Sequence, residues 1–385
     1  MANMDKLHGD VARLKKRVDQ NLDSKAVRER LDISHFGPNA ILRGVQLTLV
    51  GAHRALQNPA MFTSDHYRQA ALAVVMGVFI RLIVAVPITG IRVLLWVVSM
   101  FFPLDTVSWD DSLIDGLNFI GEYVLQLPLF LMALMRYVVP TLDSLFMQSL
   151  HWVDKTYVQK HSNDSQDDLR DMYYPNLAQY SRVVDDSTGP ESAAHALSAF
   201  LYRFARKGCI STAIFALSYL PVVGKLVLPV ASFYTFNKAA GLGLAGIIFG
   251  TGIFLPRRCL VVFLQTYFAS RSLTRELLEP YFVRVRFTKT EKRNWFRSRE
   301  GVLFGFGLGF YALMKVPLLG VLIYGIAEAS TAYLITKITD PPPPPAERRE
   351  YAASQQTWRN RHEFLSLSLA NLDNTRSNAP TPNTG

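Results

Sequence analysis

The sequence predicts an all-α integral membrane protein, built from two long transmembrane helices, broken and partly penetrating helical hairpins, and amphipathic helices near the N-terminus. Hydrophobic residues make up 49% of the 385 residues although both ends of the chain are polar, so the apolar residues are concentrated in its middle. Long apolar runs of this kind are typical of membrane proteins. Runs that proline and glycine interrupt indicate hairpins rather than continuous helices.

The stretch 301–338 shows the hairpin pattern most clearly. It is almost wholly apolar, and the sequence Val-Pro-Leu-Leu-Gly interrupts it near its centre, at Pro317 and Gly320. Each arm has roughly 16–18 residues and covers about 24–27 Å as a helix, slightly short of a ~30 Å hydrocarbon core. Two nearly upright spans are one alternative, but we favour a hairpin that enters the membrane and returns to the same side.

The same arrangement recurs upstream, at 218–232 and, more loosely, at 87–90. In 218–232, as in 314–330, a Pro-apolar-apolar-Gly break precedes an aliphatic run, a small residue and a serine. An internal repeat and a set of unrelated proline kinks both explain the pattern, and the sequence leaves the two interpretations open. The predicted hairpin breaks are Pro87, Gly90, Pro221, Gly224, Pro317 and Gly320.

The first half of the chain divides into two parts. Residues 1–68 are expected to form cytosolic amphipathic helices, one of them over 41–56, because apolar side chains recur there at helical spacing. Residues 69–152 are expected to form a pair of membrane helices, over 70–102 and 117–150, joined by a short acidic loop.

The second half divides into three parts. Residues 153–207 are expected to form a polar linker, in which the acidic cluster at 164–171 indicates a solvated face rather than a metal site. Residues 208–339 are expected to form the membrane hairpins, and the positive-inside rule places their basic loop, 269–300, in the cytosol. Residues 340–385 are expected to be a proline-rich disordered tail, because five consecutive prolines cannot continue a helix.

The net charge of +10 indicates membrane lipids as partners, through their anionic headgroups, rather than nucleic acid. The basic residues flank apolar segments, and no nucleic-acid recognition motif accompanies them. The expected headgroup contacts are Arg257, Arg258, Arg284, Arg286, Lys292, Arg293 and Arg297.

Ionisable residues also occur inside the apolar runs, where a charge costs ~2.5–3.5 kcal/mol or more. Most of them are cationic, which suits a path for anions, although snorkelling to the membrane surface or structural pairing explains them more simply. They are Arg81, Arg92, Arg136, Lys225, Lys315 and Glu328. No catalytic constellation is present in the sequence, so we expect no enzymatic activity, no cofactor and no metal.

Three segments carry a resemblance to known proteins: 299–307, 315–320 and 327–332, which read REGVLFGFG, KVPLLG and AEASTA. They resemble the C-terminal core of the fungal Lds/Rrt-type sporulation proteins of lipid droplets and the outer spore wall. More distantly, they are similar to the superfamily of the bacterial sulfate permease CysZ and the etoposide-induced protein of the endoplasmic reticulum. The resemblance implies two long membrane helices with partly penetrating hairpins.

Together, these observations predict a multi-pass membrane protein of the endoplasmic reticulum and lipid droplets with a structural or assembly role. The resemblance implies a place in spore wall formation. The alternative function is a transporter or channel for a small oxyanion such as sulfate, which the cations inside the apolar runs would favour. Assembly into a homo-oligomer is left open.

Overall fold

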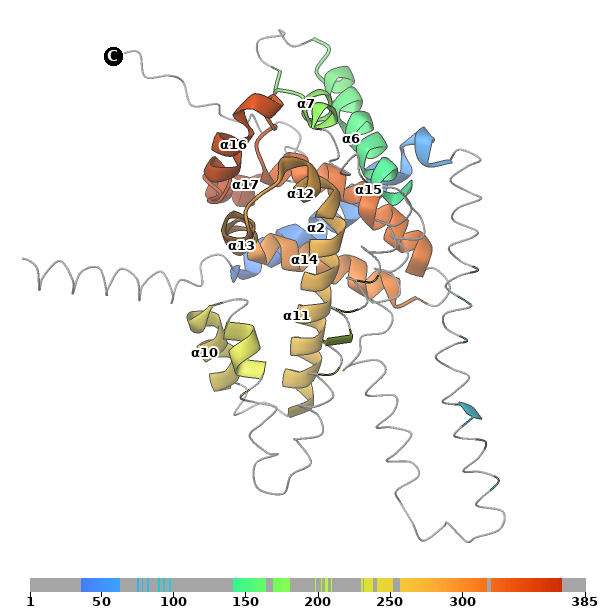
Figure 1. Cartoon of the computed structure of the whole chain (residues 1–385), viewed down its shortest axis with the longest axis vertical. Coiled ribbons are helices and arrows are strands. Elements are labelled where there is room, and N and C mark those ends of the chain that lie inside the picture. Colours follow the sequence, from blue (N-terminus) through green and yellow to red (C-terminus); the bar gives the residue numbers. More distant parts are fainter. Residues whose placement is uncertain are drawn as a thin grey trace, which may run out of the picture.

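The computed structural model describes residues 36–62, 141–163, 169–180, 232–237, 241–251, 257–316 and 320–368, with isolated positions between 75 and 97 and between 198 and 230. Every regular element in these residues is helical (Figure 1). The α-helices are, in chain order, α2 (Pro38–Leu56), α6 (Thr141–Lys160), α7 (Tyr173–Gln179), α10 (Leu242–Thr251), α11 (Arg257–Leu277), α12 (Glu279–Val285), α13 (Lys289–Ser298), α14 (Glu300–Met314), α15 (Gly320–Ile338), α16 (Arg348–Ser354) and α17 (Arg361–Ser366). Short 3-10 turns, η2 (Pro59–Phe62) and η6 (Pro345–Glu347), follow α2 and precede α16.

Helix α14 is central to the packing, because it contacts α2, α11 and α15 (Figure 1). All its side chains from Glu300 to Gly307 are buried, so protein surrounds the first two turns. Glycine recurs at every fourth position, at Gly301, Gly305 and Gly309. A glycine inside a helix costs about 1 kcal/mol relative to alanine. Its repeated use here therefore indicates that neighbouring helices come unusually close.

The approach of α2 to α14 shows this directly. A Cβ atom on Gly305 would lie 2.0 Å from the carbonyl oxygen of Ile41, and one on Gly44 would lie 2.1 Å from that of Val302. Both obstacles are backbone atoms, so no side-chain rotation could relieve the overlap. Thr48 adds a hydrogen bond, from its Oγ1 to a backbone carbonyl of α14 at 3.1 Å. Helix α2 is thus held on α14 in one register.

A buried polar cluster fixes α11 on the other side of α14. Arg271 Nη1 donates to Glu300 Oε1 at 2.5 Å, and the Tyr267 hydroxyl donates to the same oxygen at 2.6 Å. Burial raises the pKa of Glu300, and the charge of Arg271 and the Tyr267 hydrogen bond partly offset this rise. Burial also raises the pKa of Tyr267, next to the carboxylate. The cluster serves as a polar tie between the two helices.

The helix is interrupted between α14 and α15, where the sequence predicts a hairpin turn. Helix α14 ends at Met314 and α15 begins at Gly320. Helix α15 then packs against α14, α2 and α6. Its side chains from Ala327 to Thr336 are buried, among them Glu328, which is 1% exposed.

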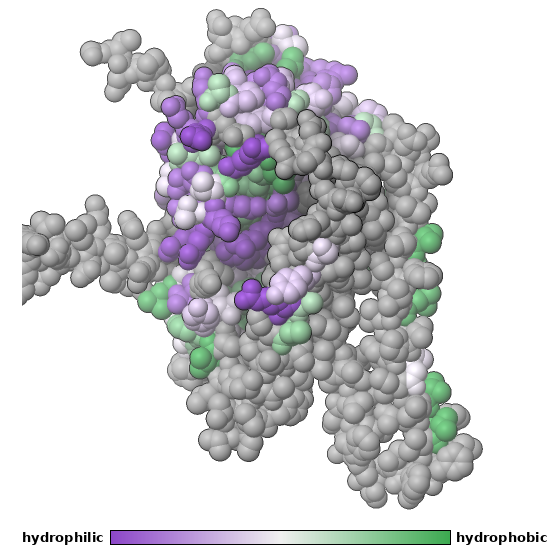
Figure 2. Space-filling view, in the orientation of Figure 1, coloured by the Kyte–Doolittle hydropathy of each residue, from purple (hydrophilic) through white to green (hydrophobic). Residues whose placement is uncertain are grey.

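Residues 269–300, expected to be a basic loop, are instead the end of α11 followed by α12 and α13. A capping box begins α13, in which Thr288 Oγ1 accepts from the backbone of Glu291 and the Glu291 carboxylate accepts from the backbone of Thr288. Trp295 and Phe296 of α13 are buried. Hydrophilic residues gather on the surface where α13 lies (Figure 2).

Part of the tail that was expected to be disordered is ordered, because residues 340–368 fold onto the helices. We call Pro341 to Pro345 the proline strap. It runs past α7, where Asn176 Nδ2 donates to the carbonyl of Pro342 at 2.8 Å and the Tyr180 hydroxyl donates to that of Pro343 at 2.6 Å. Proline lacks an N–H but keeps its carbonyl, so an extended proline run is held through its acceptors.

Two buried arginines hold the residues after the strap. Arg299 donates from Nε to the carbonyl of Ile338 at 2.7 Å and from Nη1 to that of Gln355 at 3.0 Å. Burial lowers the pKa of Arg299 to about 10. Arg43 of α2 donates to the carbonyls of Leu365 and Leu367. These bonds tie α16 and α17 to the ends of α15 and α2.

The predicted membrane architecture is contradicted. Among the helices that the structure describes, none combines the length and the hydropathy needed to cross a membrane. This finding overturns the expected two transmembrane helices, and with them the assignment as an integral membrane protein of the endoplasmic reticulum and lipid droplets. Of the two predicted spans, 70–102 lies outside the described residues except for isolated positions, and 117–150 is described only from 141, where α6 begins.

Candidate anion-binding pocket

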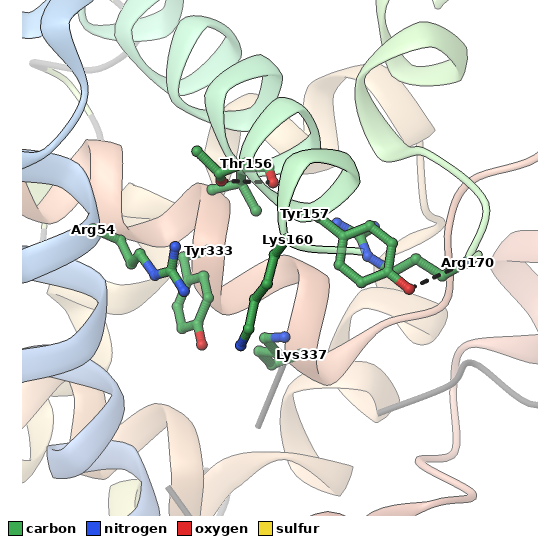
Figure 3. A pocket seen from close by; sticks show the side chains of 8 residues that line it. Arg54, Thr156, Tyr157, Lys160, Arg170, Tyr333 and Lys337 are labelled. Carbon is green, nitrogen blue, oxygen red and sulfur yellow. Dashed lines mark hydrogen bonds between the residues drawn. The ribbon is translucent and has the colours of Figure 1, made fainter. Parts of the chain in front are cut away.

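A basic pocket lies where the C-terminal parts of α2, α6 and α15 meet (Figure 3). The space between its lining atoms is about 320 Å³ when open solvent is included, so the pocket is an open hollow and not an enclosed cavity. It is lined by four cationic side chains, two tyrosines and two smaller residues. These are Arg54, Lys160, Arg170, Lys337, Tyr157, Tyr333, Val153 and Thr156.

Close packing of α2 on α15 builds one wall of the pocket. A Cβ atom on Gly51 would lie 3.1 Å from Ser330 Cβ, so the two helices touch at this point. Residues three or four positions apart share one face of a helix. Arg54 therefore follows Gly51 along the contact, and Tyr333 and Lys337 follow Ser330. The glycine thus brings cations of two helices to the same opening.

The lysine of α6 completes a convergent group of cations. In Figure 3 the charged ends of Arg54, Lys160 and Lys337, from three different helices, point toward one space. No aspartate or glutamate is among the eight described residues that line the pocket. We call these three side chains the cation triad.

The partial negative charge at a helix C-terminus is a second explanation for these cations. The size of that charge shows how much of the triad's positive charge it can balance. Arg54, Lys160 and Lys337 each lie in the last turn of their helix. A helix C-terminus carries roughly −0.5 of a charge, so three of them amount to about −1.5 against the three full positive charges of the triad. The helix ends therefore balance only about half of the triad's charge. Helix-end electrostatics alone therefore does not account for three cations at one opening.

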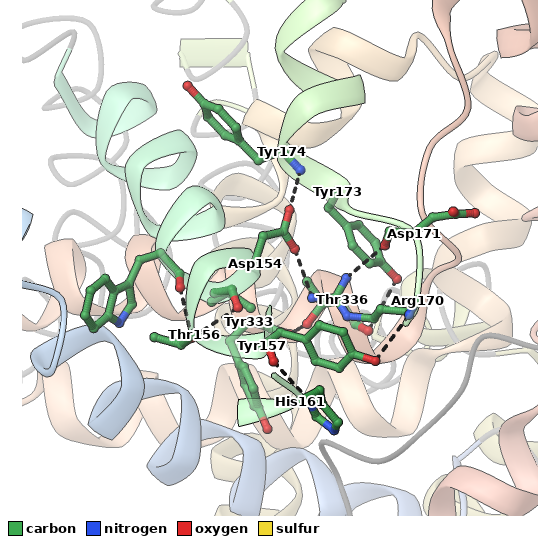
Figure 4. Close-up of polar contacts among 12 residues, drawn as sticks. Asp154, Thr156, Tyr157, His161, Arg170, Asp171, Tyr173, Tyr174, Tyr333 and Thr336 are labelled. Atoms are coloured by element: carbon green, nitrogen blue, oxygen red, sulfur yellow. Dashed lines mark hydrogen bonds and ion pairs between the residues drawn. The ribbon is translucent and has the colours of Figure 1, made fainter. Parts of the chain in front are cut away.

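The fourth cation, Arg170, belongs to a buried ion pair (Figure 4). Its Nη2 donates to Asp154 Oδ1 at 2.9 Å, and both side chains are 6% exposed. The backbone N–H of Tyr174 donates to the other carboxylate oxygen at 2.7 Å. Burial raises the pKa of Asp154, while the charge of Arg170 and the backbone N–H groups of α7 oppose the rise. This ion pair fixes the start of α7 beside the pocket and leaves Arg170 largely neutralised.

Cations and a histidine already cover the aromatic rings of the pocket. The guanidinium of Arg170 lies 4.4 Å from the centroid of the Tyr157 ring, and the His161 ring lies 4.3 Å from the same centroid. The Lys337 ammonium lies 5.1 Å from the centroid of the Tyr333 ring. Both tyrosine rings therefore contact charged or aromatic groups of the protein itself.

The cations that the sequence analysis placed inside apolar runs are not among the described residues that line this pocket. Arg81, Arg92, Arg136 and Lys225 lie outside the described residues, as do the breaks Pro87, Pro221, Gly224 and Pro317, whereas Gly90 is exposed. Lys315 is exposed, with its ammonium 4.9 Å from the centroid of the Tyr311 ring. Neither Lys315 nor Glu328 lines the pocket.

The expected headgroup contacts have mixed environments. Arg284 is 6% exposed and donates to the carbonyl of Pro280 at 2.7 Å, so it is a structural residue. Lys292 pairs with Glu279 at 2.8 Å. Arg286 and Arg293 are exposed, Arg297 is half-buried, and Arg257 and Arg258 begin α11. None of these residues lines the pocket.

Sequence reasoning missed all four cations of the pocket. For Arg54, Lys160 and Lys337 the available signal was a basic residue in the last turn of the helix, but that pattern also arises from helix-end electrostatics alone. Within the described part of the chain, no group of three or more His, Cys, Asp or Glu side chains is arranged to hold a metal ion. In the acidic cluster at 164–171, residues 164–168 lie outside the described residues.

Comparison with known proteins adds no assignment. No protein-family model matches the chain, and no curated protein and no solved structure is detectably similar to it. The resemblance to the Lds/Rrt-type proteins therefore stays a prediction.

Proposed function

We propose that the chain is an oxyanion-binding protein with a structural or assembly role, and that the basic pocket is its binding site. The cation triad carries this proposal, because three helices direct positive charge into one hollow. Two lysines act as point charges, and the arginine adds a planar pair of donors that matches the oxygens of phosphate or sulfate.

The expected affinity is modest. Two unit charges 4 Å apart interact by about 1 kcal/mol in bulk water and about 4 kcal/mol near a protein surface with an effective dielectric constant of ~20. Removal of one triad cation should therefore weaken binding by roughly tenfold, which corresponds to about 1.4 kcal/mol. Inorganic oxyanions should bind with dissociation constants on the order of millimolar, and added salt should weaken them.

Isothermal titration of the purified chain with sodium sulfate and sodium phosphate tests this proposal. The test variant is Lys160→Met with Lys337→Met. The matched control is Lys155→Met with Lys289→Met, because both control lysines are exposed and neither lines the pocket. Both double variants remove two positive charges, and each removes one of them from α6.

The proposal expects both anions to bind the wild-type chain and the control, and to bind the pocket variant at least tenfold more weakly. Equal binding to the two variants would show that net charge alone attracts the anions. Absence of binding by the wild-type chain would contradict the proposal as well.

A further inference from the structure

We infer that the proline strap is a docking site for a partner domain that binds polyproline II helices, and that α7 competes with this domain for the strap. The inference goes beyond the proposed function, because no residue of the strap is among the described residues that line the basic pocket. Three observations carry it: the conformation that consecutive prolines impose, the hydrogen bonds by which α7 holds the strap, and the exposure of the last two prolines.

Consecutive prolines fix the backbone of the strap. The ring of each proline holds φ at about −65°, and a residue before a proline is excluded from the α-helical region. Pro341 to Pro344 meet both conditions, so the polyproline II helix is the conformation left to them. Accordingly, the described chain has no helix or turn from Asp340 to Pro344, and the 3-10 turn η6 begins at Pro345.

Helix α7 and the residue that follows it hold the strap from one side. Asn176 and Tyr180 are four residues apart, so their side chains lie on the same side of α7. Asn176 Nδ2 donates to the carbonyl of Pro342 at 2.8 Å, and the Tyr180 hydroxyl donates to that of Pro343 at 2.6 Å. The protein thus binds its own polyproline segment, as the aromatic-lined grooves of proline-recognition domains bind theirs.

These hydrogen bonds do not explain why the bound residues are prolines. They involve only backbone carbonyl groups, which every residue has. Pro344 and Pro345, moreover, are exposed. A partner groove gains from the proline rings themselves, and from a helix that is formed before binding and therefore loses little entropy. The run of five prolines thus suits a partner better than it suits α7.

The exposure of the strap decides how a partner can reach it. Pro344 and Pro345 are available for a first contact, whereas Pro342 is buried. A polyproline II helix has three residues per turn, so a groove that takes several successive prolines must also take those that face α7. The partner and α7 therefore compete for Pro342 and Pro343. Removal of the two α7 hydrogen bonds should raise the affinity for the partner roughly tenfold.

The strap can leave α7 while both of its ends stay in place. The Tyr351 hydroxyl donates to the carbonyl of Asp340 at 2.5 Å, and Gln355 Nε2 donates to the Asp340 carboxylate at 2.6 Å. Arg299 Nη1 donates to the carbonyl of Gln355 at 3.0 Å. None of these hydrogen bonds involves α7, so release of the strap leaves the anchors of α16 intact.

Titration of the full chain with purified profilin tests the inference, because profilin binds runs of proline through an aromatic groove. The release variant is Asn176→Ala with Tyr180→Phe, which removes both hydrogen bonds from α7 to the strap. The proline variant is Pro344→Ala with Pro345→Ala, at two exposed positions. Circular dichroism checks that each variant is folded.

A matched control for the release variant is Asn294→Ala with Tyr174→Phe. It also removes one amide and one hydroxyl, the second of them from α7. The Asn294 amide donates to Gln356 Oε1 at 2.9 Å, and the Tyr174 ring lies 4.6 Å from the His151 ring between centroids. Neither residue makes the hydrogen bonds that hold the strap on α7.

We expect the wild-type chain and the control to bind profilin weakly, the release variant to bind roughly tenfold more tightly, and the proline variant to lose binding. Three results would overturn the inference. Equal binding by the wild-type chain and the release variant would show that α7 does not compete. Undiminished binding by the proline variant would place the contact outside the strap. Absence of binding by the release variant would show that the prolines only stiffen the chain.

Discussion

Replacement of Gly305 by alanine should disrupt the packing that places Arg54 at the pocket. The new Cβ atom would lie 2.0 Å from Ile41 O and 3.0 Å from Gly44 Cα. Because these are backbone atoms, α2 as a whole must move away from α14. The gap must open by about 1 Å, and a gap of ~0.5–1 Å already forfeits a quarter to a half of each dispersion contact.

The magnitude follows from two opposing effects. Alanine gains about 1 kcal/mol over glycine from helix propensity, whereas overpacking in a well-packed core costs ~1–3 kcal/mol and more where backbone must shift. We expect Gly305→Ala to lower the free energy of unfolding by about 3 kcal/mol. Gly325→Ala on α15 is the matched control, because its Cβ atom would meet nothing within 4 Å. It should leave stability unchanged or raise it by up to ~1 kcal/mol.

Urea unfolding followed by far-ultraviolet circular dichroism measures both variants. We expect Gly305→Ala to be less stable than Gly325→Ala by several kcal/mol. If Gly305→Ala were as stable as Gly325→Ala, the close contact of α2 with α14 would be refuted. The placement of Arg54 at the pocket, which depends on that contact, would be refuted as well.

Two further predictions concern the strap and the buried arginine. Tyr180→Phe removes the hydrogen bond to Pro343 O and should cost about 0.5–1.5 kcal/mol, with faster proteolysis of residues 340–368 as the direct readout. Arg299→Lys cannot keep the hydrogen bonds to both carbonyl groups and should lower the free energy of unfolding by ~2–4 kcal/mol. The control Arg359→Lys, at an exposed position, should change it by less than ~0.5 kcal/mol. Equal effects of the two substitutions would refute the structural role of Arg299.

Local features of the fold could be predicted from the sequence where short-range chemistry decides them. The proline and glycine at 317–320 mark the end of one helix and the start of the next, and the apolar spacing over 41–56 marks the helix that became α2. The membrane prediction was wrong because it took lipid to surround the apolar side chains. Hydropathy measures how strongly a side chain avoids water, but it does not distinguish lipid from a protein interior. The glycines of α14 pack against α2 and α11.

The pocket could not be predicted for a related reason. Arg54, Lys160 and Lys337 are far apart in the chain, and each looks like an ordinary basic residue at a helix end. Their convergence depends on the Gly51–Ser330 contact and on the packing of α6 against α15. A contact between helices distant in sequence leaves no periodic signal in one chain. The five prolines were expected to be disordered because of their own sequence. Hydrogen bonds from Asn176 and Tyr180 hold them in place, and these partners cannot be read from the proline run itself.

A crystal structure of the chain soaked in sodium tungstate tests the central claim most directly, because tungstate is a tetrahedral oxyanion whose anomalous scattering locates it without ambiguity. We expect one dominant peak in the pocket, within hydrogen-bond distance of the side chains of Arg54, Lys160 and Lys337. A dominant peak on the exposed basic surface of α13, with an empty pocket, would contradict it.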